Sequence, residues 1–449
     1  MGSNSIEGES HHHAIGIWEV NKDRLQSMQQ QISATPTLLS QAAGRSSCCI
    51  FRVPQRLVEI NGQSYQPHIV SIGPYHRGER HLKMIEEHKW RYLGSLLSRT
   101  QCKGLGLEDY LKAIHPLEAK ARECYSETVV LDTDEFIEML VLDGCFVLEL
   151  FRKVKNPDII ELDDPLFSML WLLSFFQRDL IKLQNQIPFF VLQRLFDLSK
   201  MPGEENGPSL ATLALNFFNN TLQRPDEVIE KYNNLEGKHL LDLLRSSFIP
   251  SDQGEPPKAV SPTHVIHCVS KLHRAGIKLK PGKADSFLTV TFRHGVLEMP
   301  SITIDEFTSS FLLNCVAFEQ CHSHCSNHIT TYATLLDCLI NTSKDVEYFC
   351  DRNIIENYFG TDAEVARFIN GLGKDVAFDV ERCYLSELFN KVHHYYQNSL
   401  HVQLATLKHT YFDSPWSCIS AMAAVILLLL TMAQTFYTVY PYFNPHRPR

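Results

Sequence analysis

The densest group of side chains that could do chemistry lies at residues 321–328, which read CHSHCSNH. A helix here would place four metal-ligand side chains on one face, at i, i+3, i+4 and i+7: Cys321, His324, Cys325 and His328. Seven residues of helix span about 10 Å, whereas zinc takes all its ligands at about 2.0–2.3 Å. One straight helix can therefore supply only two ligands, and the others must come from elsewhere. His264 and His267 are candidates for those positions.

The alternative for residues 321–328 is a partly buried helix face that carries free thiols. No spacing in the chain fixes the distance of a third or fourth ligand, so we assign no metal-binding residue from sequence. The question of whether this cluster binds metal stays open at this point.

Motifs for catalysis or cofactor binding are not recognisable in the sequence. Residues 276–283 (GIKLKPGK) resemble a phosphate loop, but five residues separate the glycines instead of four, and Ala284 replaces the required Ser or Thr. Acidic side chains such as Asp143, Asp305 and Glu306 could act as general acids or bases only if two groups converge on a substrate. We therefore assign no catalytic residue and no cofactor, and we predict that the protein is not an enzyme.

Composition places the 449 residues among ordinary globular proteins with an added anchor. Apolar residues make up 44% and charged residues 21%, which is enough for a large core. The net charge of −9 argues against nucleic acid as a partner. Thirteen cysteines is an odd number in a long chain, which favours reduced thiols over a disulfide framework.

The C-terminal region predicts one transmembrane helix. Residues 414–445 contain no Asp, Glu, Lys, Arg or His, and residues 416–440 (WSCISAMAAVILLLLTMAQTFYTVY) are long enough to cross about 30 Å of hydrocarbon. Trp416, Tyr437 and Tyr440 stand near its ends, where amphipathic rings favour the headgroup level. The lipid bilayer is therefore an expected partner, and the protein is expected to be single-pass.

A stripe of small side chains runs along one face of this segment: Ser417, Ser420, Ala421 and Ala424. Small residues let helix backbones approach closely in lipid, so the stripe makes a homodimer one expected partner, with chance as the alternative.

Two arguments on topology oppose each other. Lys408 precedes the span and Arg447 and Arg449 follow it, which taken literally places the tail in the cytosol. Export of the whole body without a signal peptide is harder than insertion of the C-terminal helix after synthesis. We therefore predict a cytosolic body with a C-terminal anchor. Which membrane holds it, plasma membrane or endomembrane, is left open.

The body between the termini shows mainly helical periodicity. Helices are predicted over residues 81–98, 136–154 and 166–198, the last interrupted by Pro188. Arg178, Asp179 and Lys182 exclude a second membrane span there. Five apolar side chains are predicted to lie deep in this helical bundle: Leu142, Phe146, Leu150, Phe189 and Phe190.

Strand signals are few. Residues 50–54 and 67–74 alternate weakly, and residues 287–292 and 296–304 predict a hairpin in which Gly295 supplies the permissive backbone of the turn. The predicted fold is mainly α (α+β): a large helical body with a small antiparallel β-sheet, plus one C-terminal transmembrane helix. The predicted segments are a disordered head at 1–45, a single domain at 46–412 with a linker or excursion near 250–262, the span at 413–440 and a tail at 441–449.

Blocks in order along residues 49–442 resemble the plant-specific family known as "domain of unknown function 247". They are residues 69–76 (IVSIGPYH), 142–150 (LDGCFVLEL), 185–192 (NQIPFFVL), 239–245 (HLLDLLR), 339–342 with Asp345 and Val346, and 411–416 with Thr431, Gln434 and Thr435. The resemblance implies a plant protein with a helical body, a C-terminal membrane helix and unknown biochemistry. Some grass relatives act as pollen-side determinants of self-incompatibility, so the resemblance favours recognition of a partner.

The function predicted from these features is a membrane-tethered recognition or scaffold protein of plants that acts through protein–protein interaction. The partner protein is unknown. The alternative is a membrane-associated enzyme, a hydrolase or transferase, with an unrecognised site. A soluble metalloprotein held at the membrane is a third interpretation, which depends on Cys321, His324, Cys325 and His328.

Overall fold

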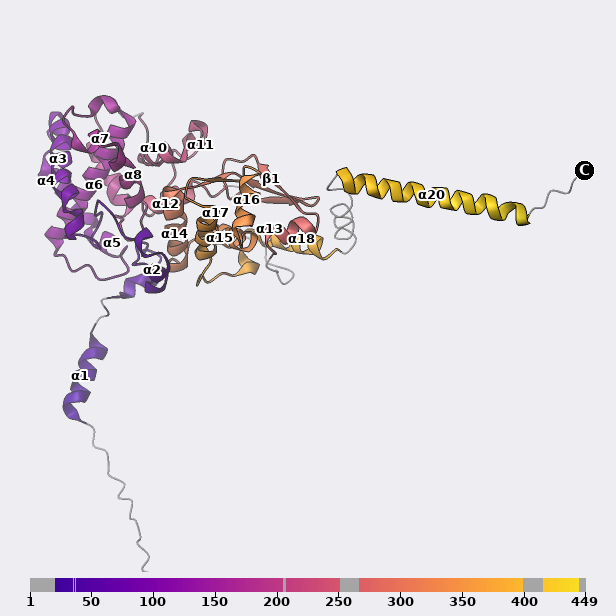
Figure 1. Ribbon diagram of the computed structural model, residues 1–449. Coiled ribbons are helices and arrows are strands. Elements are labelled where there is room, and N and C mark those ends of the chain that lie inside the picture. The colour runs from indigo at the N-terminus through magenta and orange to yellow at the C-terminus, as the bar shows by residue number, and fades with distance from the viewer. Residues whose placement is uncertain are drawn as a thin grey trace, which may run out of the picture.

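The computed structural model describes residues 21–34, 36, 38–204, 207–250, 266–398 and 415–443. Several predictions fall outside these ranges: the first twenty residues of the predicted head, nearly all of the linker near 250–262, the block at 411–414, His264, and the charged residues that flank the span. Those predictions stay predictions. The described chain is mainly helical with short strands, and the predicted fold class is confirmed (Figure 1).

Helix α6 (Thr133–Lys155) is the centre of the N-terminal half of the body. It begins at a capping box, in which the Asp132 carboxylate accepts from the Glu135 N–H and the Glu135 carboxylate accepts from the Asp132 N–H. Apolar residues occur all round the helix, so it is buried on every side by its neighbours. These are α3 (Lys83–Thr100), α4 (Leu107–Ile114), α9 (Phe189–Ser199) and α10 (Leu210–Leu222).

Close packing between α6 and α9 depends on Gly144. A Cβ atom at this position would collide with Leu195 Cδ1, so a larger residue would require the Leu195 side chain to move. Leu142, Phe146, Leu150 and Phe189 are buried as predicted. The prediction for Phe190 is wrong: its ring is only partly buried, because it lines an open cavity.

Helix α14 (Glu306–Cys321) is the centre of the C-terminal half. It packs against α8 (Leu170–Asp179), α12 (Leu240–Ser246), α15 (His328–Leu339) and α17 (Asp362–Leu372). The helix predicted over residues 166–198 is interrupted earlier than Pro188, since α8 ends at Asp179 and the chain is not helical again until α9. The remaining helices are α1 (Lys22–Ser33), α2 (Gln55–Asn61), α5 (Glu118–Arg122), α7 (Pro165–Ser168), α11 (Asp226–Glu230), α13 (Val269–Arg274), α16 (Ser343–Cys350), α18 (Ser386–Gln397) and α20 (Pro415–Phe443).

The predicted hairpin is present. Strands β2 (Thr291–Arg293) and β3 (Val296–Pro300) pair antiparallel around a two-residue turn, in which His294 and Gly295 both have positive φ, 50° and 76°. Such a turn matches the twist of the strands but needs residues that tolerate left-handed backbone. Adding a Cβ to Gly295 would also clash with the Tyr395 ring.

The prediction of a single antiparallel sheet needs a correction, because the three-stranded sheet is mixed and the two-stranded sheet is parallel. Strand β1 (Lys278–Gly282) pairs parallel with β3, and β4 (Ile302–Ile304) pairs parallel with β5 (Ile355–Asn357). Two parallel strands cannot be joined by a tight turn and need a longer crossover connection. In this fold α13 contacts β1 and α16 contacts β5. The weak strand prediction at 67–74 is wrong as well, since this segment is extended but pairs with side chains instead of a strand.

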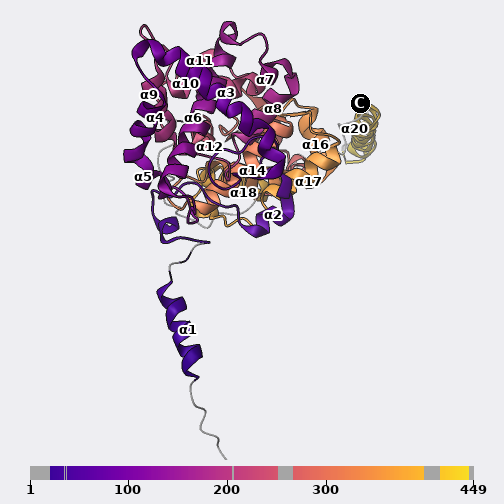
Figure 2. The ribbon, with the colours of Figure 1, turned by 90° about the vertical axis from the view of Figure 1, so that its left-hand side faces the viewer.

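The two terminal helices differ from the body in burial. Helix α1 lies within the predicted head and all of its residues are exposed, whereas from Ser40 the chain contacts the body, where the Ser40 N–H donates to Ser126 O at 2.8 Å. Helix α20 contains an apolar stretch, Ile419–Tyr440, of which no residue is buried. Both helices project from the body (Figures 1 and 2).

Candidate functional site

An apolar groove lies between α3, α4 and α6, and we call it the α3–α6 groove. Helix α4 is held in place at its N-terminus, where the Asp109 carboxylate accepts from the Gly106 N–H at 2.8 Å. Its apolar face then packs on α6 and leaves a hollow of 380 Å³ beside α3. The lining is mostly apolar: Trp90 and Leu93 from α3, Leu107 and Leu111 from α4, and Ile137, Val141 and Leu142 from α6.

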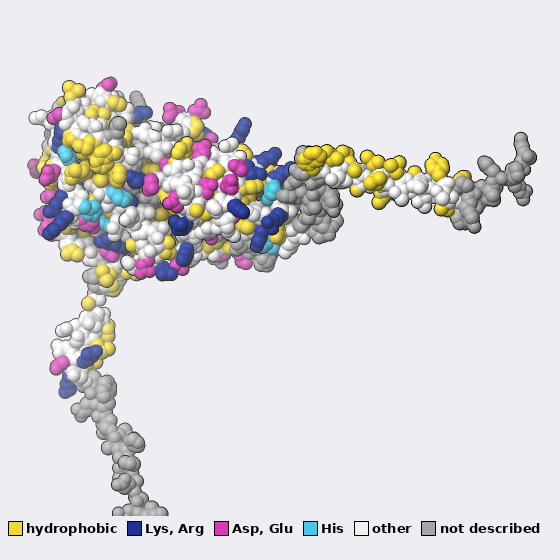
Figure 3. Space-filling view, in the orientation of Figure 1, with side chains coloured by type: hydrophobic (Ala, Val, Ile, Leu, Met, Phe, Trp, Pro, Cys, Tyr) yellow, Lys and Arg dark blue, Asp and Glu magenta, His cyan; other side chains and the backbone are white. Residues whose placement is uncertain are grey.

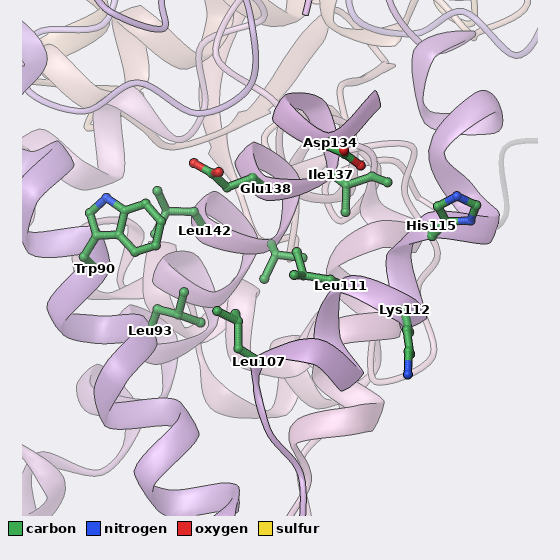
Figure 4. Close-up of a pocket in the computed structure, with 11 residues that line it drawn as sticks. Trp90, Leu93, Leu107, Leu111, Lys112, His115, Asp134, Ile137, Glu138 and Leu142 are labelled. Atoms are coloured by element: carbon green, nitrogen blue, oxygen red, sulfur yellow. The ribbon is translucent and has the colours of Figure 1, made fainter. Parts of the chain in front are cut away.

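The groove combines a buried floor with exposed apolar walls. Ile137 and Leu142 are almost fully buried, whereas Trp90 is 49% exposed and Leu107 is 40% exposed. Figure 4 shows Trp90 at one end and His115 at the other, with leucine side chains between them. Hydrophobic side chains gather over this end of the body (Figure 3). An aromatic ring that stays half-exposed beside a cavity is typical of a surface that binds a partner.

Charged groups of both signs border the groove. Lys112 lies on α4 and pairs with Glu108 at 2.6 Å, with both side chains well exposed. Asp134 and Glu138 lie on α6, and Glu138 contacts Arg77 at 3.6 Å. An occupant with apolar side chains and a basic group toward α6 would fit this border.

The cluster at residues 321–328 does not lie on one helix. Helix α14 ends at Cys321, His322 caps it, and α15 begins at His328, so the side chains are spread over a helix end, a turn and a helix start. Within the described ranges, no three His, Cys, Asp or Glu side chains converge as metal ligands do. His267 lies elsewhere, against the Tyr396 ring with the centroids 4.5 Å apart.

Burial governs the titration of this cluster. It raises the pKa of Cys321 to about 11 and that of Cys325 to about 12, so both remain thiols at neutral pH. Burial also lowers the pKa of His328 to about 4, and neither of its ring nitrogens has a hydrogen-bond partner within the described part of the chain. The ring instead stacks on Tyr384, with the centroids 4.7 Å apart. The alternative of one helix face is therefore wrong in its geometry, since the cluster spans a turn between two helices, whereas the thiols of Cys321 and Cys325 are free.

A second cavity contains two cysteines that the sequence did not single out. It measures 650 Å³ and is lined by Cys49, Cys124, Lys120, Lys238, Phe189, Phe190 and neighbouring polar residues; we call it the cysteine cavity. Cys49 and Cys124 are free thiols, and both line this cavity. Sequence spacing could not reveal this pair, because its members lie on segments far apart in the chain.

Comparison with known proteins gives the family. A sequence profile of DUF247, described as a plant protein of unknown function, matches residues 50–430. The chain belongs to this family. It is similar to the UPF0481 protein At3g47200 of Arabidopsis thaliana, with 40% identity over 435 residues that cover 92% of this chain and 90% of the relative. The putative UPF0481 protein At3g02645 of the same plant is 25% identical over 492 residues, covering 88% and 90%. No solved structure matches the chain.

The DUF247 block at residues 69–76 is held by buried side chains. The Asp179 carboxylate accepts from the N–H groups of His68, Ile69 and Val70, and Asn185 accepts from Ile72 N at 2.7 Å. The extended segment therefore satisfies its backbone donors without a neighbouring strand. The block has a structural role here, since its partners are buried and face no cavity.

The acidic candidates also have structural partners in this DUF247 fold. Asp143 pairs with buried Lys89 and accepts from Gly73 N at 2.8 Å. Asp305 caps α14 by accepting from Thr308 N at 2.7 Å, and Glu306 lies 3.7 Å from Arg178. Asp305 also lines a cavity of 510 Å³ together with Asp285 and Glu356, but Asp143 and Glu306 do not line it, so the three candidates do not converge on one site.

Proposed function

We propose that this DUF247 protein is a membrane-tethered module that recognises another protein through the α3–α6 groove. The membrane tether is supported by α20. The apolar stretch of this helix has 22 residues and a mean hydropathy of 2.0, and none of its residues is buried against the body. A helix this apolar is covered either by protein or by lipid. The described body does not cover it, which supports lipid.

The ends of α20 support the same interpretation. Trp416 at one end and Tyr437 and Tyr440 at the other are exposed, by 79%, 74% and 53%. Such rings favour the two interfaces of a bilayer. The body that this helix anchors is proposed to be cytosolic.

Recognition is assigned to the groove because of its shape and border. A volume of 380 Å³ accommodates one or two large apolar side chains, and the half-exposed Trp90 would lose water on binding. The proposed partner is a protein that presents an amphipathic helix, with apolar side chains over Leu107 and Leu111 and a basic residue toward Asp134 and Glu138.

Flotation of the full chain with liposomes tests the tether. The wild-type chain should float with the vesicles and should resist extraction at alkaline pH. A variant with Leu427→Arg and Leu428→Arg places two charges in the middle of the apolar stretch, at a cost of about 3 kcal/mol each, and should be extracted. Retention of this variant in the membrane, or extraction of the wild type, would contradict the proposal.

Proximity labelling in plant cells tests the groove. We expect Trp90→Ala to lose specific neighbours that the wild-type chain labels. Trp171→Ala is the matched control, because Trp171 is 50% exposed and packs on Phe175 away from the groove. Equal labelling by both variants would remove the groove from consideration, and thermal midpoints of both variants would show whether either is merely unfolded.

A further inference from the structure

The cysteine cavity holds two thiols that parallel backbone pairing brings face to face. Ile50 and Tyr125 form a parallel bridge, in which Ile50 N donates to Cys124 O at 2.8 Å and Ser126 N donates to Ile50 O at 2.9 Å. The preceding residues, Cys49 and Cys124, are therefore opposite each other, and their side chains lie on the same side of the pairing. The Cys49 N–H also donates to Cys124 O at 2.9 Å.

This arrangement meets the geometric needs of a disulfide. Neighbouring paired strands lie about 4.7–4.9 Å apart, within the 4.4–6.8 Å Cα separation that disulfides span. The two thiols are near enough for each to shift the pKa of the other. Cys48 is the alternative partner in sequence, and it too interacts electrostatically with Cys124, but it does not line the cavity.

The surroundings favour a thiolate on Cys124. Its pKa is lowered, first by the hydrogen bond from the Cys49 thiol and then by the charges of Lys120 and Lys238, against burial and the Glu123 carboxylate. The pKa of Cys49 is raised by the same hydrogen bond and by burial. In its neutral form the Cys124 thiol donates to Lys120 O at 3.4 Å. The thiolate is the nucleophilic form of cysteine, and these shifts make Cys124 the more readily deprotonated of the two sulfurs.

We propose that Cys49 and Cys124 form a reversible redox site, in which hydroperoxides are the oxidant and Cys49 is the resolving thiol. The Cys124 thiolate attacks one oxygen of the hydroperoxide, so that an S–O bond forms, the O–O bond breaks and the alcohol or water leaves after taking up a proton. Cys49 sulfur then attacks Cys124 sulfur, forming the S–S bond and releasing the second oxygen as water with the Cys49 proton.

The balance is two thiols and one hydroperoxide giving one disulfide, one alcohol or water, and one further water. Two molecules of a small thiol such as glutathione reverse the change by thiol–disulfide exchange. The cavity of 650 Å³ is large enough to admit either reagent. The new bond would link the segment that enters the body at Cys49 to the segment that joins α5 to α6.

Mass spectrometry of the full chain in detergent micelles tests the proposal. The reduced protein is treated with hydrogen peroxide, free thiols are alkylated, and tryptic peptides are sequenced. The wild-type chain should yield peptide 46–52 linked to peptide 123–152, with Cys49 and Cys124 as the joined residues, and dithiothreitol should release it. Exposed Cys102 serves as the internal reference for unselective oxidation.

Three variants identify which cysteines form the disulfide bond. Cys49→Ala and Cys124→Ala should both abolish the linked peptide, whereas Cys48→Ala should retain it. Cys49→Ala should also leave Cys124 to be oxidised further, to a sulfinic acid, because the resolving thiol is missing.

Oxidation of Cys102 while Cys49 and Cys124 remain alkylatable would overturn the proposal. A linked peptide that survives Cys49→Ala but not Cys48→Ala would overturn it as well. The wild-type measurement decides the first outcome even if a variant fails to fold. Neither measurement depends on a membrane or a protein partner, so this result is independent of the proposed function.

Discussion

The Lys89 Nζ lies 2.6 Å from the Asp143 Oδ1, although only 1% and 2% of these two side chains are exposed. Lys89 also donates to Ser71 O and to Glu86, and Asp143 accepts from Gly73 N. The pair thus links α3, α6 and the DUF247 block at residues 69–76 inside the body.

Breaking this pair on one side should be more costly than removing both charges. Lys89→Met leaves the buried Asp143 carboxylate without its cation, so it should lower the free energy of unfolding by about 3–5 kcal/mol. Asp143→Asn should cost less, because Lys89 keeps its ion pair with Glu86. The double variant should lose less than the sum of the two. Urea unfolding of the full chain in detergent measures all four proteins, and a loss under about 1 kcal/mol for each single variant would contradict the prediction.

Substitutions in the core around α6 should lower the free energy of unfolding far more than substitutions at the rim of the cysteine cavity. Phe146 is fully buried and packs against Tyr92 and Phe176, so Phe146→Ala should cost about 3–5 kcal/mol. Phe190→Ala should cost less than half as much, since its ring is only partly buried. Equal losses in urea unfolding would show that Phe190 is part of the core.

Stability should fall as the pH is lowered below the ordinary pKa of histidine. Burial lowers the pKa of His239 from 6.5 to about 4, and it acts in the same direction on His322 and His328. Between these two pH values the unfolded chain binds more protons than the folded chain. The free energy of unfolding therefore keeps the whole contribution of these histidines above pH 6.5 and decreases as the pH falls toward 4. His239 alone accounts for about 3 kcal/mol of this decrease.

Urea unfolding between pH 7.5 and 5 measures this dependence. His239→Gln should be less stable at pH 7.5 and should show a flatter pH profile than the wild type. His324→Gln is the control, because His324 is exposed. A wild-type profile that is flat over this range would refute the prediction.

Dimerisation through the face of α20 that carries the small side chains Ser417, Ser420, Ala421 and Ala424 remains a prediction. Ala421→Leu with Ala424→Leu fills the space that would let two helices approach, so any dimer signal in a membrane two-hybrid assay should weaken. Val425→Leu with Leu429→Val changes exposed apolar positions without filling that face and serves as the control. A signal that the alanine changes leave intact would exclude this face.

Topology is open to a direct measurement. With a cytosolic body, protease added to sealed microsomes should digest the body and leave only a fragment that contains α20. Glycan on Asn219 or Asn341, or a body that resists protease until detergent is added, would place the body on the opposite side.

Local patterns predicted the elements that depend on nearby residues. The apolar run that predicted a helix over residues 136–154 is a local feature, and so are the turn residues of the β2–β3 hairpin. The apolar run of α20 is local too. Each of these elements is stabilised by residues within a few positions of itself. Periodicity could not predict that the chain turns between Cys321 and His328, because apolar and polar residues there fit a continued helix equally well.

The sequence by itself determined the helical fold class, the family and the apolar C-terminal helix, because these follow from composition, short-range spacing and ordered blocks of residues. Only the tertiary structure decided the α3–α6 groove, the burial of Asp143 beside Lys89 and the contact between Cys49 and Cys124. Each of these joins segments far apart in the chain. Their meeting depends on how helices pack around α6, and no local pattern carries that information.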